Sequence, residues 1–209
     1  HFTNGTVPAL AGCIAQSQNG QNVTNQIATC TAHHIFIARK ITTSTTNQIG
    51  YFKTELIKPI APNYFSDKTR MAALTSMCSL LNSLLPESQQ YIAIYEAVEK
   101  FLSNLTYELW VVFYIYLEIN LIKELGFDTN LKVFYKPEDN IFDLKKVSID
   151  RFNYEVPNFL IKQEVPNKIT NLLIKKSLFF TRSVLLNKFF IPNNLKIPNS
   201  RIIFENYFN

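Results

Sequence analysis

Apolar positions are densest between residues 105 and 131, where the sequence LTYELWVVFYIYLEINLIKELGFDTNL contains the only tryptophan of the chain. A nearly unbroken apolar run from 109 to 117 ends at Glu118, and Gly126 follows eight residues later. A helix that is apolar on most of its circumference belongs in the middle of a core, whereas a membrane span needs about 20 consecutive apolar residues. The pattern therefore predicts a buried central helix over 105–125, ended by Gly126 as a left-handed C-cap.

Two amphipathic helices are predicted before the central one. Ser66 and Asp67 are candidate N-caps of the first, which Pro86 ends, and the second begins at 87–88. Apolar residues recur at helical spacing in both. They are Met71, Leu74, Met77, Cys78, Leu81 and Leu85 in the first helix, and Tyr91, Ile94, Tyr95, Val98 and Leu102 in the second.

After the central helix the period changes. The segments LKVFY (131–135) and KKVSI (145–149) are β-like and predict a small insertion of hairpin type at about 127–156. Pro157 and Pro166 are expected to frame a linker.

Two further helices are predicted at the C-terminal end. Asn167 is a candidate cap for a helix over 168–190, and Pro198 fits the first turn of a last helix. The first should bury Ile169, Leu172, Leu173, either Leu178 or Phe179, and either Leu185 or Leu186; the second carries Ile202, Ile203 and Phe204.

Residues 1–50 are polar and have no helical period, so we expect short strands of a small β domain, with partial disorder as the alternative. The segment 49–57 has the composition of a strand, and Pro59 and Pro62 mark a boundary. The chain is therefore predicted to be α+β, with domains at 1–62 and 63–209.

Charge is unevenly distributed along this globular composition of 47% hydrophobic and 18% charged residues. The net charge is +3 over 1–62, −3 over 63–126 and +5 over 127–209. Basic ends suit an anionic partner, and the alternative is that these lysines only keep the surface solvated.

Catalytic and metal-binding patterns are missing from the sequence. Cys13, Cys30 and Cys78 form neither a CxxC pair nor a disulfide framework, which fits a reducing cytoplasm. His33 and His34 are adjacent and would point to opposite faces of a strand. No glycine-rich phosphate loop occurs. We therefore expect a protein that is not an enzyme and uses no cofactor. Because the chain starts at His1, we also expect a fragment of a longer reading frame.

The order of these segments resembles a known family. The sequence runs IGYFKTELIKP, SDKTRMAALTSMCSLLNSLLPE, YIAIYEAVEKFL and YLEINLIKELGFDTNL, followed by VPNFL, FFTRSVLLNKFF and LKIPNSRIIF. Over residues 48–208 it is similar to RecO, a bacterial recombination mediator, in its α-proteobacterial form. The most specific part is Leu117-Glu118, Leu121 and the ELGF of 124–127.

The resemblance implies an N-terminal OB-fold, here partial, followed by a mainly helical domain. It also implies a DNA repair and homologous recombination mediator of the RecF pathway, acting in the bacterial cytoplasm and not in a membrane. Such a protein binds single- and double-stranded DNA, anneals strands, and contacts RecR and the acidic tail of single-stranded-DNA-binding protein (SSB). It thereby helps to load RecA onto SSB-coated DNA. The alternative is a helical protein–protein interaction module that has lost DNA binding.

Three departures from the family pattern bear on function. Zinc-bearing members have four cysteines in the insertion, and residues 127–156 contain none, so no metal is expected. Tyr116 stands where many members have arginine, two residues before Glu118. Residues 1–47 match the family poorly.

The resemblance guides the choice of site residues. Single strands are bound by cations that contact the phosphates and by aromatic rings on which the bases stack. Tyr51 and Phe52 are candidates for such stacking, although an aromatic residue in a strand is more often part of the core. The predicted DNA-binding residues are Arg39, Lys40, Lys53, Lys58, Lys175, Lys176, Arg182, Lys188, Lys196 and Arg201.

A partner-tail pocket is predicted on the central helix. An apolar groove with a cation at its rim suits a terminal carboxylate, and its candidates are Phe113, Tyr116, Leu117 and Lys123. Glu118, within the apolar helix, should have a buried cationic or hydroxyl partner because an unpaired buried carboxylate is costly.

Overall fold

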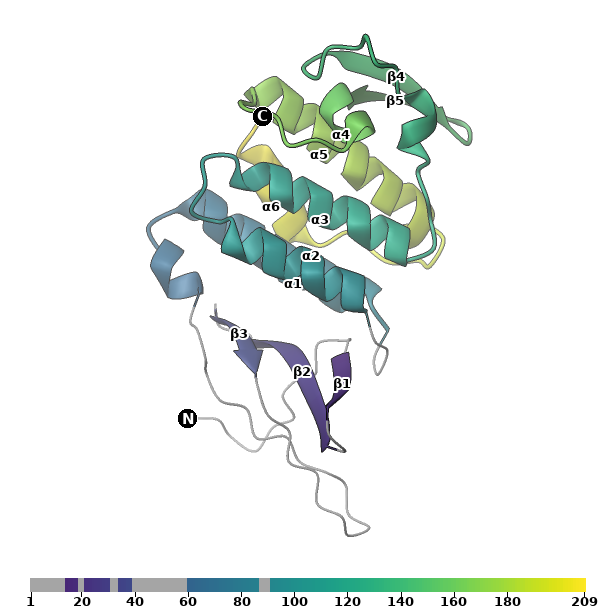
Figure 1. The fold of residues 1–209 in the computed structure, drawn as a ribbon. Coiled ribbons are helices and arrows are strands. Elements are labelled where there is room, and N and C mark those ends of the chain that lie inside the picture. Colours follow the sequence, from purple (N-terminus) through teal and green to yellow (C-terminus); the bar gives the residue numbers. More distant parts are fainter. Residues whose placement is uncertain (1–13, 19–20, 31–33, 39–59, 87–90) are drawn as a thin grey trace.

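The computed structural model describes residues 14–18, 21–30, 34–38, 60–86 and 91–209 (Figure 1). The first three ranges form an antiparallel sheet in the order β1 (Ile14–Gln18), β2 (Gln21–Cys30) and β3 (His34–Ala38). Short strands therefore occur where they were expected. The strand predicted at 49–57 lies outside the described residues, and the OB-fold stays a prediction.

The helical region begins with a 3-10 turn, η1 (Ala61–Tyr64), and α1 (Lys68–Leu84). The Asp67 side chain accepts a hydrogen bond of 2.9 Å from the backbone N–H of Arg70, as an N-cap does. The predicted cap and the end of the helix before Pro86 are confirmed. The second predicted helix is α2 (Ile92–Ser103), which buries Ala97 and Phe101 in addition to the expected Ile94, Val98 and Leu102.

The central helix, α3 (Trp110–Glu124), begins five residues later than the predicted 105. Arg70 on α1 contacts the non-helical segment before α3. Its guanidinium donates to the carbonyl oxygens of Leu105 at 2.7 Å and Tyr107 at 3.3 Å, and it lies 5.2 Å from the ring centroid of Trp110. The N–H groups of Tyr107 and Trp110 bond carbonyls three residues back, those of Asn104 and Tyr107, so the segment before Trp110 forms turns and not an α-helix.

Gly126 ends α3 as predicted. Its φ is +89°, its N–H bonds the carbonyl of Lys123 at 2.9 Å, and the N–H of Phe127 bonds the carbonyl of Ile122 at 3.2 Å. These two bonds form a Schellman motif, which requires a left-handed residue at this position.

The insertion is a hairpin, but its bounds differ from those predicted. β4 (Leu144–Ile149) pairs antiparallel with β5 (Phe152–Pro157), with Val147 opposite Tyr154. The predicted strand at 131–135 is wrong, because these residues form a 3-10 helix, η2 (Leu131–Phe134). Leu131 is buried and Val133 is 79% exposed, so only one side of the segment reaches the core.

The predicted linker after Pro157 is also wrong. Residues directly following this proline form a short helix, α4 (Asn158–Lys162). Phe159, Leu160 and Ile161 are buried together with Asn158, whose side chain donates to the carbonyl of Asn140 at 2.8 Å. α4 is thus part of the core.

Thr170, not Asn167, caps the next helix, α5 (Asn171–Leu185), by accepting from the N–H of Leu173 at 3.4 Å. Leu178 and Leu185 are buried, whereas Phe179 is 50% exposed. The prediction that Leu172 is buried is wrong, since it is 56% exposed.

The predicted helix continues past α5 in a different form. It runs on as a π-helical turn, η3 (Leu186–Phe190), and Ile191 N–H bonds the carbonyl of Leu186 at 2.9 Å, five residues back. The last helix, α6 (Asn199–Asn206), has Pro198 as its N-cap and buries Phe204.

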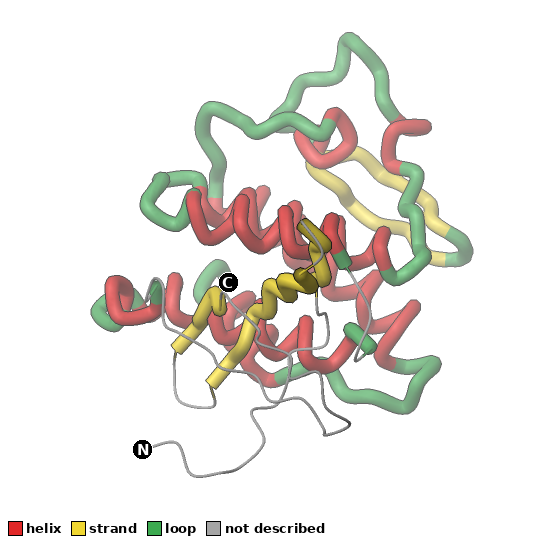
Figure 2. The backbone as a smooth tube through the Cα atoms, turned by 60° about the horizontal axis from the view of Figure 1, so that its bottom comes forward, coloured by secondary structure: helices red, strands yellow, loops and turns green. Residues whose placement is uncertain are grey.

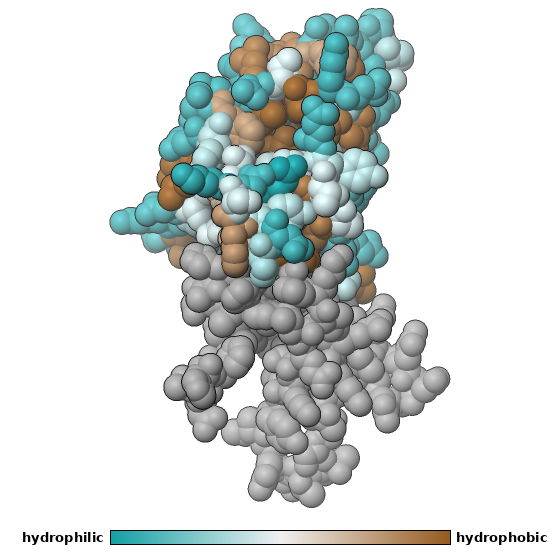
Figure 3. Space-filling view, turned by 90° about the vertical axis from the view of Figure 1, so that its left-hand side faces the viewer, coloured by the Kyte–Doolittle hydropathy of each residue, from teal (hydrophilic) through white to brown (hydrophobic). Residues whose placement is uncertain are grey.

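The helices pack around α3 (Figures 1 and 2). α2 lies along one side of α3 and α5 along the other, while α6 packs mainly on α1, and the β4–β5 hairpin packs on α5. Among the described residues, no helix is both long and apolar enough to cross a bilayer. On the face in Figure 3, apolar side chains reach the surface in groups separated by polar ones.

Candidate functional site

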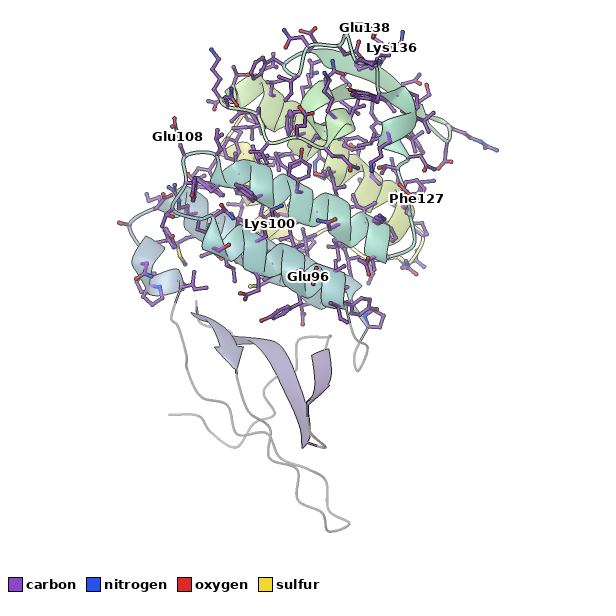
Figure 4. The ribbon with its side chains drawn as sticks, viewed as in Figure 1. Glu96, Lys100, Glu108, Phe127, Lys136 and Glu138 are labelled. Atoms are coloured by element: carbon purple, nitrogen blue, oxygen red, sulfur yellow. The ribbon has the colours of Figure 1, made fainter. Side chains whose placement is uncertain are left out.

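A groove of about 350 Å³ runs beside α3. Its apolar lining comes from α3, η2, α4 and the loops that follow α3 and α4. It includes Phe113, Leu117, Phe127, Leu131, Leu160 and Val165. Figure 4 places Lys100 on α2 next to α3, and Phe127 at the C-terminal end of α3. The groove thus extends along the central helix.

Three lysines line the same groove, Lys100, Lys123 and Lys132, and they outnumber the single carboxylate among its lining residues, Asp128. All three are exposed. The Lys100 ammonium lies 6.0 Å from the ring centroid of Phe113, which keeps this cation over the apolar lining. An apolar channel with a net positive rim suits a ligand that has apolar side chains and a carboxylate.

Tyr116 connects α3 to α4 at the wall of the groove. Its hydroxyl oxygen lies 2.7 Å from the carbonyl oxygen of Glu164 and 3.0 Å from that of Phe159, so the hydroxyl donates to the backbone. Burial raises the pKa of Tyr116, and the Glu164 carboxylate adds to the rise. The hydroxyl proton is therefore used within the protein, and an anion in the groove would be met by the lysines.

The structure brings the four predicted pocket residues together, since Phe113, Tyr116, Leu117 and Lys123 all line the groove. That a partner's tail binds there stays a prediction. Lys100 and Lys132 were not predicted from the sequence. They lie in other segments, and the spacing of apolar residues within each segment does not show that these segments pack against α3.

Glu118 lies at the centre of a buried polar network, as its position in the apolar helix predicted. Arg201 on α6 bonds both of its carboxylate oxygens, with Nη2 to Oε2 at 3.0 Å. The hydroxyl of Tyr114 donates to Oε1 at 3.0 Å, and Thr181 donates to Oε2. Glu118 and Arg201 are 1% and 0% exposed.

A second carboxylate extends this network to the surface. Glu205 accepts from Arg201 Nη1 at 3.0 Å and from Arg182 Nε at 2.8 Å. Burial by itself lowers the pKa of Arg201, but the charge and hydrogen bond of Glu118, together with Tyr114 and Glu205, outweigh this effect, and the pKa is raised. The network fastens α6 to α3 and α5.

This network corrects one predicted DNA contact. Arg201 is completely buried, and its N–H groups bond Glu118, Glu205 and the carbonyl of Leu178. No phosphate can reach it in this structure, so Arg201 is a core residue and not part of a DNA-binding surface.

The other C-terminal cations differ in their partners. Lys175 and Lys196 are exposed. Three are paired within the protein, namely Lys176 with Glu155, Arg182 with Glu205, and Lys188 with Asp150. The hydrogen bond and charge of Lys176 lower the pKa of Glu155. Arg39, Lys40, Lys53 and Lys58 lie outside the described residues.

Within the described part of the chain, no group of three or more His, Cys, Asp or Glu side chains is arranged to hold a metal ion. The hairpin insertion provides no thiolate ligand, because residues 127–156 contain no cysteine.

Comparison with protein families gives a match over residues 66–153 to the family "Recombination protein O C terminal". This region contains α1, α2 and α3, with Glu118 and most of the groove. Over these residues the chain is similar to the RecO C-terminal family. The resemblance drawn from the sequence is thus confirmed for the central part of the chain.

Individual relatives agree with this assignment. The chain is 35% identical over 80 residues to the DNA repair protein RecO of Rhodospirillum centenum, covering 38% of this chain and 32% of that protein. It is 32% identical over 85 residues to the protein of the same name from Wolbachia pipientis subsp. Culex pipiens, covering 40% and 35%. For the one from Ehrlichia chaffeensis the identity is 30% over 87 residues, covering 41% and 36%.

Each of these alignments thus spans about a third of the relative's length. No solved structure matches the chain.

Proposed function

We propose that this chain acts in DNA repair as a RecO-type mediator, by binding DNA and protein partners and without covalent chemistry. The observation that carries the proposal is the match of residues 66–153 to the RecO C-terminal family, whose relatives are named DNA repair proteins. In this role the chain binds single- and double-stranded DNA and anneals strands in the bacterial cytoplasm. It contacts RecR and the SSB tail, and helps to load RecA onto SSB-coated DNA.

The proposed DNA surface uses the exposed cations of the C-terminal region, chiefly Lys175 and Lys196. Lys176 adds to them, because its ion pair with Glu155 is exposed. Exposed pairs contribute little stability, so a phosphate can replace the carboxylate at small cost. Electrostatic contacts of this kind predict affinity that falls as salt rises.

The experiment is fluorescence anisotropy of a labelled oligo-dT strand titrated with the full chain at several salt concentrations. We expect the slope of log affinity against log salt to change by about 0.7 for each phosphate contact. Lys175→Glu should weaken binding and make the slope shallower.

Lys136→Glu is the matched control, since it makes the same charge change in the exposed loop before β4, away from α5 (Figure 4). Absence of oligo-dT binding by the wild-type chain at low salt would refute direct DNA binding.

The groove beside α3 supports the second part of the proposal, which is capture of an acidic partner tail. Apolar side chains of the tail would occupy the channel lined by Phe113 and Leu117, and its terminal carboxylate would meet Lys100, Lys123 or Lys132. The same groove is also compatible with the alternative function, a helical interaction module without DNA binding.

A peptide with apolar residues and a free C-terminal carboxylate tests the groove. Binding should weaken when the carboxylate is amidated or when Lys123 is replaced by Glu, and Lys136→Glu should leave it unchanged. Equal binding of the free and amidated peptides would contradict recognition of the carboxylate. Peptide binding together with absent DNA binding would favour the interaction module.

A further inference from the structure

The solvent-facing side of α5 carries an aromatic ring that the core does not use. Phe179 is 50% exposed and Leu172 is 56% exposed. Lys175, three residues after Leu172 and four before Phe179, is also exposed. Side chains spaced by three and four residues share a helix face, so these three form one stripe, which we call the α5 stripe. The buried residues of α5 lie on its other side, against α3 and β5.

Cations stand on both sides of the ring in the α5 stripe. Lys175 lies one helical turn before Phe179, and Arg182 lies about one turn after it. The guanidinium carbon of Arg182 is 5.2 Å from the Phe179 ring centroid, close enough for a cation–π interaction. Glu205 holds Arg182 through its Nε at 2.8 Å. The guanidinium over the ring is thus held by Glu205, a member of the buried network.

This arrangement selects the chemistry of an occupant. A half-exposed ring with a guanidinium over it and a lysine one helical turn away complements a chain that alternates planar rings with negative charges. Unpaired nucleotides have this structure, whereas a duplex keeps its bases stacked inside. An acidic peptide would meet the cations, but it would bring a planar ring only where an aromatic residue lies next to its carboxylates, whereas every nucleotide combines a planar base with a phosphate.

We propose that Phe179 is a stacking platform for an unpaired base, with Lys175 and Arg182 contacting the phosphates on either side of it. The proposal rests on the DNA-binding role proposed above. It adds Phe179 to the DNA-binding residues, and as an uncharged residue Phe179 is not indicated by the distribution of charge. The stacking on the ring contributes affinity for DNA that does not depend on salt, and the contacts of the cations with phosphates contribute affinity that falls as salt rises.

Replacing Phe179 with Trp gives a direct readout, because the indole becomes an exposed fluorophore at the proposed platform. The native Trp110 is 7% exposed and provides a constant background. We expect oligo-dT to quench the added fluorescence in parallel with the anisotropy signal of the labelled strand. Phe152→Trp is the matched control, since Phe152 is 46% exposed on the hairpin, and it should show no quenching.

The outcomes separate this proposal from the general one. Saturable anisotropy without quenching of Phe179→Trp would overturn stacking at Phe179 and leave DNA binding intact. Absence of any oligo-dT binding would overturn both. A fluorescence change that depends on protein concentration without DNA would assign the α5 stripe to self-association and would also overturn the proposal.

Affinity gives an independent measure. Base stacking on an aromatic ring predicts that Phe179→Ala weakens oligo-dT binding by about 5- to 150-fold while leaving the salt slope unchanged. Lys175→Ala should instead reduce the slope by about 0.7. Affinity of Phe179→Ala equal to the wild type would overturn the proposal.

Discussion

Replacement of Arg201 by Met removes the one cation that, among the residues the structure describes, contacts Glu118. Glu118 would keep the hydroxyl groups of Tyr114 and Thr181, but its charge would be left at 1% exposure without a counter-ion. The carbonyl oxygen of Leu178 would also lose its hydrogen bond from Arg201, and Glu205 would lose one of its two hydrogen-bond donors. The destabilisation therefore has one dominant physical cause, which is an uncompensated buried carboxylate.

The magnitude follows from that cause. Removal of one partner from a buried ion pair costs about 3–5 kcal/mol. For a chain of this size each kcal/mol lowers the melting temperature by about 2–4 °C, so we expect a fall of about 6–20 °C. Arg151→Met is the control, because Arg151 is exposed at the hairpin turn, and its effect should stay within about 0.5 kcal/mol.

Urea denaturation followed by the fluorescence of Trp110 measures this effect. Trp110 lies 6.0 Å from the ring of Phe204 on α6, so the signal reports the docking of the helix that carries Arg201. The double variant Glu118→Gln, Arg201→Met removes the buried charge as well as its partner, and it should be more stable than Arg201→Met alone.

Two results would refute this reasoning. One is an Arg201→Met variant within about 1 kcal/mol of the wild type, since loss of a counter-ion from a fully buried carboxylate cannot be that cheap. The other is a double variant as unstable as the single one, which would locate the cost in packing and not in charge.

Three further predictions concern single positions. Asp67→Ala should destabilise α1 by about 1 kcal/mol through loss of the N-cap. Burial raises the pKa of Asp67, but hydrogen bonds and charge from Arg70 lower it overall, so this contribution is present above the unfolded pKa near 3.8 and is lost as the pH falls through the lower folded value. Urea titrations at pH 7 and pH 3 check this, and a difference that persists unchanged at the lowest pH would contradict it. Gly126→Ala should lower the free energy of unfolding by about 1 kcal/mol, because a residue with a side chain is strained at φ +89°. No atom lies within 4 Å of the added Cβ, so a clash does not contribute. Thermal unfolding measures the effect, and unchanged stability would argue against the left-handed cap. Burial raises the pKa of the Cys78 thiol to about 12, so in a variant whose other cysteines are serine, a thiol reagent at pH 8 should label the native protein far more slowly than the protein in urea. Equal rates would contradict the burial of this thiol.

Features that depend on neighbours in the sequence could be predicted without the structure. The period of apolar residues in α1 and α3, the Asp67 cap and the Gly126 stop are each determined within a few residues. The need of Glu118 for a partner also followed from its place in an apolar helix. The partner itself did not, because Arg201 is 83 residues away and is indistinguishable in sequence from a surface cation.

What only the tertiary structure decided depends on how segments pack. Residues after Pro157 form α4 because the core accepts Phe159, Leu160 and Ile161, although two prolines frame a segment that reads as a linker. The phase of α5 buries Leu178 and leaves Leu172 and Phe179 in solvent, a choice that depends on where α3 and β5 contact it.

The groove combines residues that could be predicted from local sequence with residues that only tertiary packing brings together. Phe113, Leu117 and Lys123 share the central helix, so their proximity followed from helical spacing alone. Lys100, Lys132 and Leu160 join them only because three other segments pack beside α3. Local sequence thus determines the elements and their caps, since those bonds close within one or two turns. The site is formed by contacts between elements, and the free energy of those contacts depends on residues far apart in the chain.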